Sequence, residues 1–87
     1  MHDARRRKLH FRSEHRGIKE MDIIFGRFAR AVLPDLPDAE LDDYERIVEL
    51  PDDDLLAWAM GARPVPEAVR SPLLDRFLDL AHMHGTE

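Results

Sequence analysis

The sequence predicts an all-α fold, a small five-helix bundle that forms a single domain. Its apolar residues recur every three or four positions, and no stretch alternates apolar and polar residues as a half-buried strand does. Glycines number only 4, and the Asn-Gly or Asp-Gly pairs of tight hairpins are missing. A chain of 87 residues has room for one hydrophobic core, which we expect to span about residues 5–82 between short flexible tails.

The first two predicted helices differ in how much apolar surface they offer. Residues 3–13 carry Leu9 and Phe11 among basic side chains, so we expect this helix to hold only by docking on the rest of the chain. Residues 18–33 carry one continuous apolar stripe and end at Pro34, which cannot continue a helix. The second helix should therefore bury a full face, whereas the first buries little.

Two further helices are predicted in the acidic part of the chain. Residues 37–50 start with a proline and acidic side chains, which suit the first turn of a helix, and Pro51 ends them. Residues 53–60 follow Asp52, a good N-cap, and stop before Gly61, a residue type that often follows a helix end.

The fifth predicted helix lies within residues 66–84. Pro72 inside a helix would remove a hydrogen bond and clash with the preceding turn, so we expect a loose first turn and a firm helix from Pro72, capped by Ser71. Packing the five segments in a small antiparallel bundle buries their apolar stripes.

The charged residues are distributed unevenly. Up to Arg30 the chain has nine Lys+Arg against four Asp+Glu, and after it four against fourteen, for a net charge of −5. The basic part keeps nucleic acid open as a partner. Cysteine is absent, no apolar run approaches the ~20 residues of a membrane span, and the N-terminus lacks the apolar stretch of a signal peptide. We therefore expect a cytoplasmic protein.

No pattern of residues indicates a catalytic or metal centre. No two histidines have the i, i+4 spacing that often binds zinc, and the carboxylate runs stand at predicted helix starts, where capping explains them. A glycine-rich phosphate loop and a Gly-x-Ser-x-Gly elbow are both missing. We expect neither an enzyme nor a metal-binding protein. The histidines are His2, His10, His15, His82 and His84.

The most informative segment is the junction of the first two predicted helices. Gly17 can take the positive φ that a tight corner between helices needs. Arg16 should lie just outside the second helix, and Glu20 in its first turn, so that the corner presents both charges side by side. Such a corner can dock a partner. Alternatively, Glu20 or Asp22 pairs with Arg16 or Lys19 and only stabilises the turn.

The pattern Arg16-Gly17-x-x-Glu20-x-Asp22 resembles the Arg-Gly-x-x-Glu signature of the SdhE family, also called succinate dehydrogenase assembly factor 2. The resemblance covers roughly residues 5–80. One departure is His15, where some members carry a second arginine. The further segments that resemble the family, in order, are residues 11–15, 21–25, 44–49 and 52–58.

The resemblance implies a five-helix assembly factor that is not itself an enzyme. It would bind the flavoprotein subunit of succinate dehydrogenase, and often that of fumarate reductase, and promote covalent attachment of FAD to a histidine of that subunit. The FAD belongs to the client, so we expect no stably bound cofactor, and we expect a monomer. The partner-binding residues that the resemblance implies are Arg16, Gly17 and Glu20, with Asp22 in addition, and we expect Arg12 and His15 from the preceding segment to join them.

Two other readings remain open at this point. One is a small helical regulator that binds nucleic acid or a toxin through the basic residues 5–8. The other is an unrelated helical adaptor that merely shares the pattern.

Overall fold

The computed structural model describes residues 2–85. The α-helices are α1 His2–Glu14, α2 Lys19–Val32, α3 Leu41–Val48, α4 Asp52–Ala59 and α5 Pro72–Gly85. Single turns of 3-10 helix are η1 Leu33–Asp35, η2 Asp38–Glu40 and η3 Glu67–Val69. The described residues contain no strand, so the predicted all-α fold with five helices is confirmed. The predicted flexible tails fall partly on residues 1 and 86–87, which lie outside the described residues.

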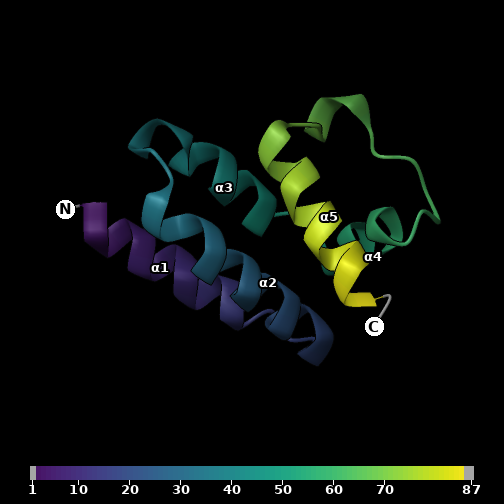
Figure 1. Ribbon diagram of the computed structural model, residues 1–87, viewed down its shortest axis with the longest axis horizontal. Coiled ribbons are helices and arrows are strands. Elements are labelled where there is room, and N and C mark those ends of the chain that lie inside the picture. The colour runs from purple at the N-terminus through teal and green to yellow at the C-terminus, as the bar shows by residue number, and fades with distance from the viewer. Residues whose placement is uncertain (1, 86–87) are drawn as a thin grey trace.

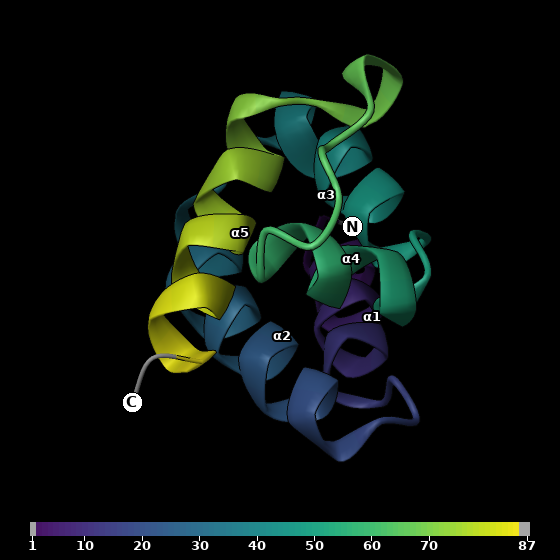
Figure 2. The same cartoon turned by 90° about the vertical axis from the view of Figure 1, so that its right-hand side faces the viewer.

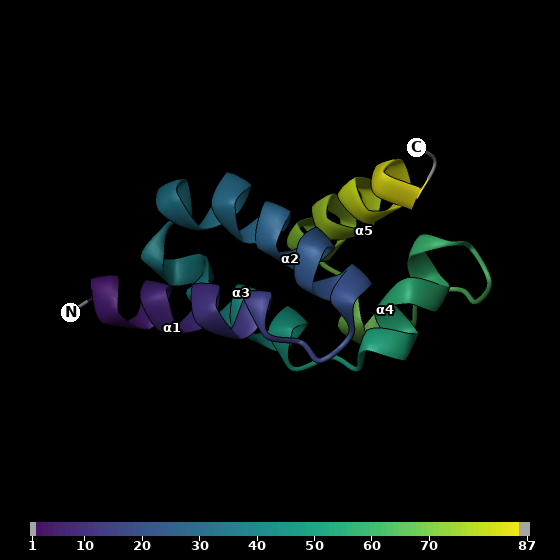
Figure 3. The same cartoon turned by 90° about the horizontal axis from the view of Figure 1, so that it is seen from below.

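The helices pack mainly in neighbouring pairs. Figure 1 shows α1 and α2 side by side and running in opposite directions, with α3 beside them and α5 next to α2 on the side away from α1. α4 packs against α5, and Figure 2 shows the long connection that leads from one to the other. Seen from below, the bend between α1 and α2 stands at the edge of the molecule (Figure 3). This arrangement places the start of α2 close to the end of α5.

The core is built around α2. Its predicted apolar stripe is buried except at Ile18, which is 39% exposed. Rings from three helices meet there: Phe28 stacks on Tyr44 with centroids 5.5 Å apart, and Phe25 lies 4.6 Å from Phe77. Burying such side chains stabilises the fold by roughly 1.5–3 kcal/mol each before the entropy of ordering them is subtracted. The buried stripe residues are Met21, Ile24, Phe25, Phe28, Ala29 and Val32.

Helix α1 holds to the rest of the molecule through few apolar contacts, as predicted. Leu9 is buried, whereas Phe11 is 62% exposed. A buried polar contact adds to Leu9: Ser13 Oγ donates to the Leu9 carbonyl (2.8 Å) and lies 2.6 Å from the Tyr44 hydroxyl. Because a carbonyl can only accept, the serine proton goes to Leu9 and Tyr44 donates to Ser13. This pair joins α1 to α3 without leaving a buried polar group unsatisfied.

The buried Tyr44 predicts that the protein loses stability at alkaline pH. Burial raises the pKa of Tyr44 to about 12. In the unfolded chain the tyrosine ionises near pH 10, so the free energy of unfolding keeps its full value below that pH. It falls by about 2–3 kcal/mol as the pH rises from about 10 to about 12. Urea unfolding across this range measures the loss. The Tyr44→Phe variant should not show the loss of stability that comes from ionisation of Tyr44.

Tyr44 is the only tyrosine among the 87 residues, so tyrosinate absorbance reports it directly. A folded protein whose tyrosine titrates near pH 10 would contradict this expectation.

Helices α3 and α4 differ from their predicted boundaries. Pro37 keeps an extended backbone (ψ 146°) instead of starting a helix, and after one 3-10 turn α3 begins only at Leu41. Asp52 was predicted as the N-cap of α4, and this is wrong. Pro51 occupies the cap position, and the Asp52 carboxylate accepts a hydrogen bond from Arg16 instead. The Asp52 carboxylate therefore binds the Arg16 guanidinium and does not cap the backbone N–H groups of α4.

Two predicted helix ends are confirmed. Gly61 has a φ of +75°, and its N–H donates to the Trp58 carbonyl (3.2 Å) while the next N–H reaches Ala57 (2.8 Å), which closes α4 with a Schellman motif. Ser71 Oγ accepts the Leu74 N–H at 3.0 Å, so it caps α5 and the firm helix starts directly after it.

Candidate functional site

Residues 15–18 form a tight bend between α1 and α2. Gly17 has a φ of +97°, a conformation that favours glycine, and Ile18 is extended before α2 begins. Asp22, one turn inside α2, reaches back over the bend: its Oδ1 accepts the Arg16 N–H at 2.5 Å. The backbone of the bend is thereby held in one conformation.

The Arg16 side chain points into the molecule. Its Nε donates to Asp52 Oδ1 and its Nη2 to the Leu50 carbonyl, both at 2.8 Å, while Nη1 donates to the Val48 carbonyl. The guanidinium lies 4.6 Å from the centroid of the Phe25 ring, and only 9% of the side chain is exposed. The prediction that Arg16 shows its charge at the corner is therefore wrong, because its donors are used inside the protein.

We call this set of contacts the Arg16 clasp; it consists of Arg16, Asp52 and the carbonyls of Val48 and Leu50. Val48 ends α3, where free carbonyls carry partial negative charge, and Asp52 begins α4. The Arg16 guanidinium thus donates both to backbone carbonyls at the end of α3 and just after it and to the carboxylate at the start of α4. The clasp fixes the bend against the α3–α4 junction, over a separation of 32 to 36 residues in sequence.

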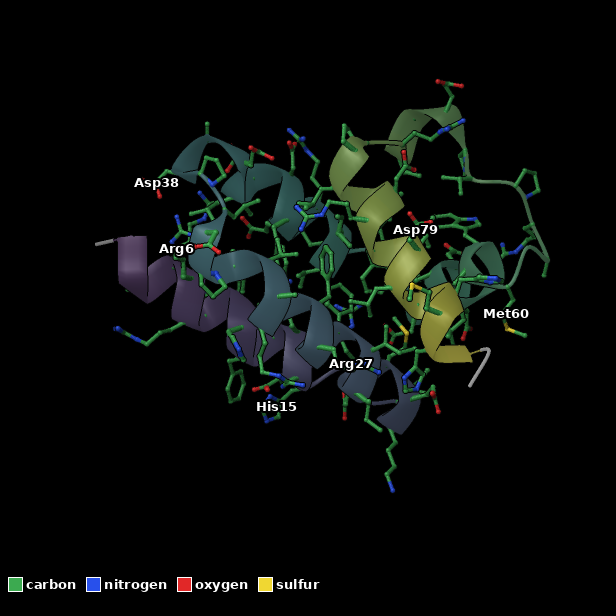
Figure 4. All side chains as sticks on the ribbon, viewed as in Figure 1. Arg6, His15, Arg27, Asp38, Met60 and Asp79 are labelled. Atoms are coloured by element: carbon green, nitrogen blue, oxygen red, sulfur yellow. The ribbon has the colours of Figure 1, made fainter. Side chains whose placement is uncertain are left out.

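The outer surface of the bend is open. Gly17 is exposed, and a Cβ built there would meet nothing within 4 Å. His15 is also exposed, and its ring stacks on the exposed Phe11 with centroids 3.9 Å apart. His15 Nδ1 lies 2.7 Å from the Phe11 carbonyl, to which it must donate. Figure 4 shows His15 at the outer edge of the molecule, below α1.

Arg12 lies beside the bend and faces α3. It forms an ion pair with Glu45 (3.6 Å) and lines a shallow hollow together with His15 and Val48. The Arg12 guanidinium is therefore paired with a carboxylate of α3, and its side chain is only partly exposed to solvent.

Glu20 is exposed, as predicted, but its partner was not foreseen. Its Oε2 lies 2.6 Å from Nε2 of His84, which is 64 residues further along the chain in the last turn of α5. The Glu20 side chain is 56% exposed and the His84 side chain 20%. Of the predicted local alternatives, a pair of Glu20 with Arg16 or Lys19 is not what the structure shows, whereas Asp22 does contact Arg16, through the backbone N–H of that residue. No local pattern in the sequence connects Glu20 to His84; only the packing of α5 on α2 does.

An open hollow of about 390 Å³ lies beside this pair, between α2, α4 and α5. Its lining is mostly apolar, and Met60, 77% exposed, stands at its rim (Figure 4). The lining residues are Glu20, Ile24, Leu56, Ala59, Met60, Ala81, His82 and His84.

Three basic residues of α1, Arg5, Arg6 and Arg12, are paired with the chain's own acidic residues. Arg5 contacts Asp42 (2.6 Å) and Glu45 (2.9 Å), and its guanidinium holds the pKa of the Asp42 carboxyl below its usual range. Arg6 contacts Asp38 (2.8 Å) and donates to carbonyls at the end of α2 and in the following turn. These arginines therefore dock α1 on α3 and on the turns that precede α3, and the nucleic-acid reading is not favoured.

Within the described residues, no group of three or more histidine or carboxylate side chains could hold a metal ion. The helices there are also too short or too polar for any of them to cross a bilayer.

Comparison with known proteins gives consistent matches. The family model Sdh5, flavinator of succinate dehydrogenase, matches residues 7–81. The chain is 43% identical over 76 residues to the FAD assembly factor SdhE of Acetobacter pasteurianus, covering 87% of this chain and 70% of that protein.

Mitochondrial relatives match as well. Succinate dehydrogenase assembly factor 2 of Yarrowia lipolytica is 32% identical over 83 residues, which cover 91% of this chain and 57% of that protein. The corresponding protein of Schizosaccharomyces pombe is 35% identical over 69 residues, 79% of this chain and 50% of that protein. The chain thus spans about half the length of these two relatives. From its helices, its signature bend and these matches, we conclude that the chain belongs to the Sdh5 family, the flavinators of succinate dehydrogenase.

Proposed function

We propose that this chain binds the flavoprotein subunit of succinate dehydrogenase and promotes covalent attachment of FAD to that subunit, as an assembly factor. Membership of the flavinator family and the names of its relatives support this role. The FAD is the client's cofactor. We extend the proposal to the flavoprotein subunit of fumarate reductase as a second client and to the monomer as the acting species.

Support for the location of the binding surface comes from the bend itself. Its signature residues divide into two groups: Arg16 and Asp22 are used internally and hold the backbone, whereas Gly17 and Glu20 face solvent. A partner can therefore approach the Gly17 backbone closely and place a donor against the Glu20 carboxylate.

A surface that is rigid before binding suits the task. Flavinylation needs the acceptor imidazole of the client held close to the flavin, so a bound assembly factor contributes by fixing geometry. Ordering a loop or a long side chain at an interface opposes binding by about 0.5–1.5 kcal/mol per side chain. The clasp and the Asp22 contact order the bend in the free protein. The exposed Phe11–His15 stack adds apolar surface next to it.

Replacing Glu20 by alanine should lower the rate of covalent flavin attachment at least about tenfold, because a charge-assisted hydrogen bond to the client is worth about 1.5–3 kcal/mol. The assay mixes the purified apo flavoprotein subunit, FAD and the variant, and measures the flavin that stays on the client after denaturation. Glu67→Ala, which removes an exposed carboxylate on η3, is the matched control and should behave as wild type. Equal rates for Glu20→Ala and wild type would remove Glu20 from the mechanism.

A further inference from the structure

We infer that His84 is a positioning residue for Glu20: it holds the carboxylate in the orientation in which it meets the client, a role that rests on the function proposed above. The contacts that carry this inference join Glu20 in the first turn of α2, Arg27 further along α2 and His84 in the last turn of α5. Figure 4 labels Arg27.

The hydrogen bonds around His84 define its tautomer. Arg27 Nη1 lies 3.1 Å from His84 Nδ1. A guanidinium can only donate, so Nδ1 carries the lone pair and accepts from Arg27. The ring proton is then on Nε2, which donates to Glu20 Oε2 at 2.6 Å. Arg27 therefore selects the tautomer of His84, and His84 in turn orients Glu20.

This contact holds one oxygen of an otherwise exposed side chain. The Glu20 side chain is 56% exposed, whereas the His84 side chain is only 20% exposed and lies between α2 and the hollow. An exposed glutamate that lacks a partner samples many rotamers, and a client that binds it must first fix one. With Oε2 held by His84, the carboxylate is already oriented when a donor of the client arrives.

Removing the imidazole donor should therefore weaken client binding without unfolding the protein. A partly exposed hydrogen bond contributes little to stability, so we expect His84→Phe to shift Tm by no more than about 5 °C. Its affinity for the apo flavoprotein subunit, measured by titration calorimetry, should fall about three- to tenfold. His84→Gln, whose amide N–H can replace the imidazole N–H, should bind within about twofold of wild type.

The Glu20→Ala background separates positioning from direct contact. If His84 acts through Glu20, His84→Phe causes no further loss of affinity once Glu20 is alanine. An equal loss in both backgrounds, or no loss in the wild-type background, would overturn the inference. If Glu20→Ala itself bound the client as tightly as wild type, the proposed site would fail instead, so the two failures are distinguishable.

A spectroscopic measurement tests the tautomer without the client. Long-range ¹H–¹⁵N spectra of the imidazoles, with His84→Gln identifying the signal, should show a protonated Nε2 and an unprotonated Nδ1. Arg27→Met should remove this preference and lower client affinity in the same direction as His84→Phe. A protonated Nδ1 in the wild-type protein would contradict the proposed arrangement.

Discussion

The Arg16→Ala variant is expected to lose about 3–5 kcal/mol of its free energy of unfolding and to melt at least about 10 °C below wild type. The substitution leaves the Asp52 carboxylate, 12% exposed, without its cation and the carbonyls of Val48 and Leu50 without a donor. A domain of 87 residues has a total stability of roughly 4–13 kcal/mol, so this loss is a large fraction of it. Urea unfolding followed by circular dichroism measures the change.

Two further variants make this test specific. Arg16→Lys should recover little of the loss, because a lysine cannot reproduce the forked donors that reach three acceptors at once. Arg63→Ala removes an arginine whose pair with Asp54 is half exposed, and it should cost less than about 1 kcal/mol. An Arg16→Ala protein as stable as wild type would mean that the clasp does not hold the bend.

Replacing Gly17 by arginine is expected to reduce covalent flavin attachment to the client at least about tenfold. Two effects combine. Any side chain at a φ of +97° strains the backbone by about 1–2 kcal/mol, and a long side chain on the open face of the bend blocks a client that must approach closely. The flavinylation assay described for Glu20 measures the combined effect.

Two controls at Gly17 separate strain from bulk. Gly17→Ala has the strain but little bulk, since its Cβ would meet nothing within 4 Å. It should lose about 1–2 kcal/mol of stability yet flavinylate far better than the arginine variant. Gly17→Asn, a residue type that tolerates positive φ, should be more stable than Gly17→Ala. If the alanine and arginine variants flavinylate equally, bulk at this position plays no part.

The sequence predicts those parts of the fold that depend on neighbouring residues. The α2 stripe follows from apolar spacing, and the ends at Gly61 and Ser71 follow from residue types whose conformations or side chains suit a helix end. The third predicted helix fails at its start because Pro37 fits both a first helical turn and an extended connection, and the local sequence does not decide between them.

The site is harder to predict than the fold, because the partners of its charged residues are distant in the sequence. The residue pattern correctly indicates a bend at Gly17 and an exposed Glu20. It cannot show that Arg16 turns inward, since Asp52 follows 36 positions later and looks like a helix cap on its own. His84 likewise becomes a partner of Glu20 only through the packing of α5 on α2.

The Arg16 clasp makes the shape of the proposed binding surface depend on complete folding. A copy in which α3 and α4 have not yet formed their junction lacks the acceptors for Arg16, so its corner has no fixed shape to offer. If the bend binds the client as proposed, only completely folded molecules present the binding surface, and Arg16 couples that surface to the folding of α3 and α4.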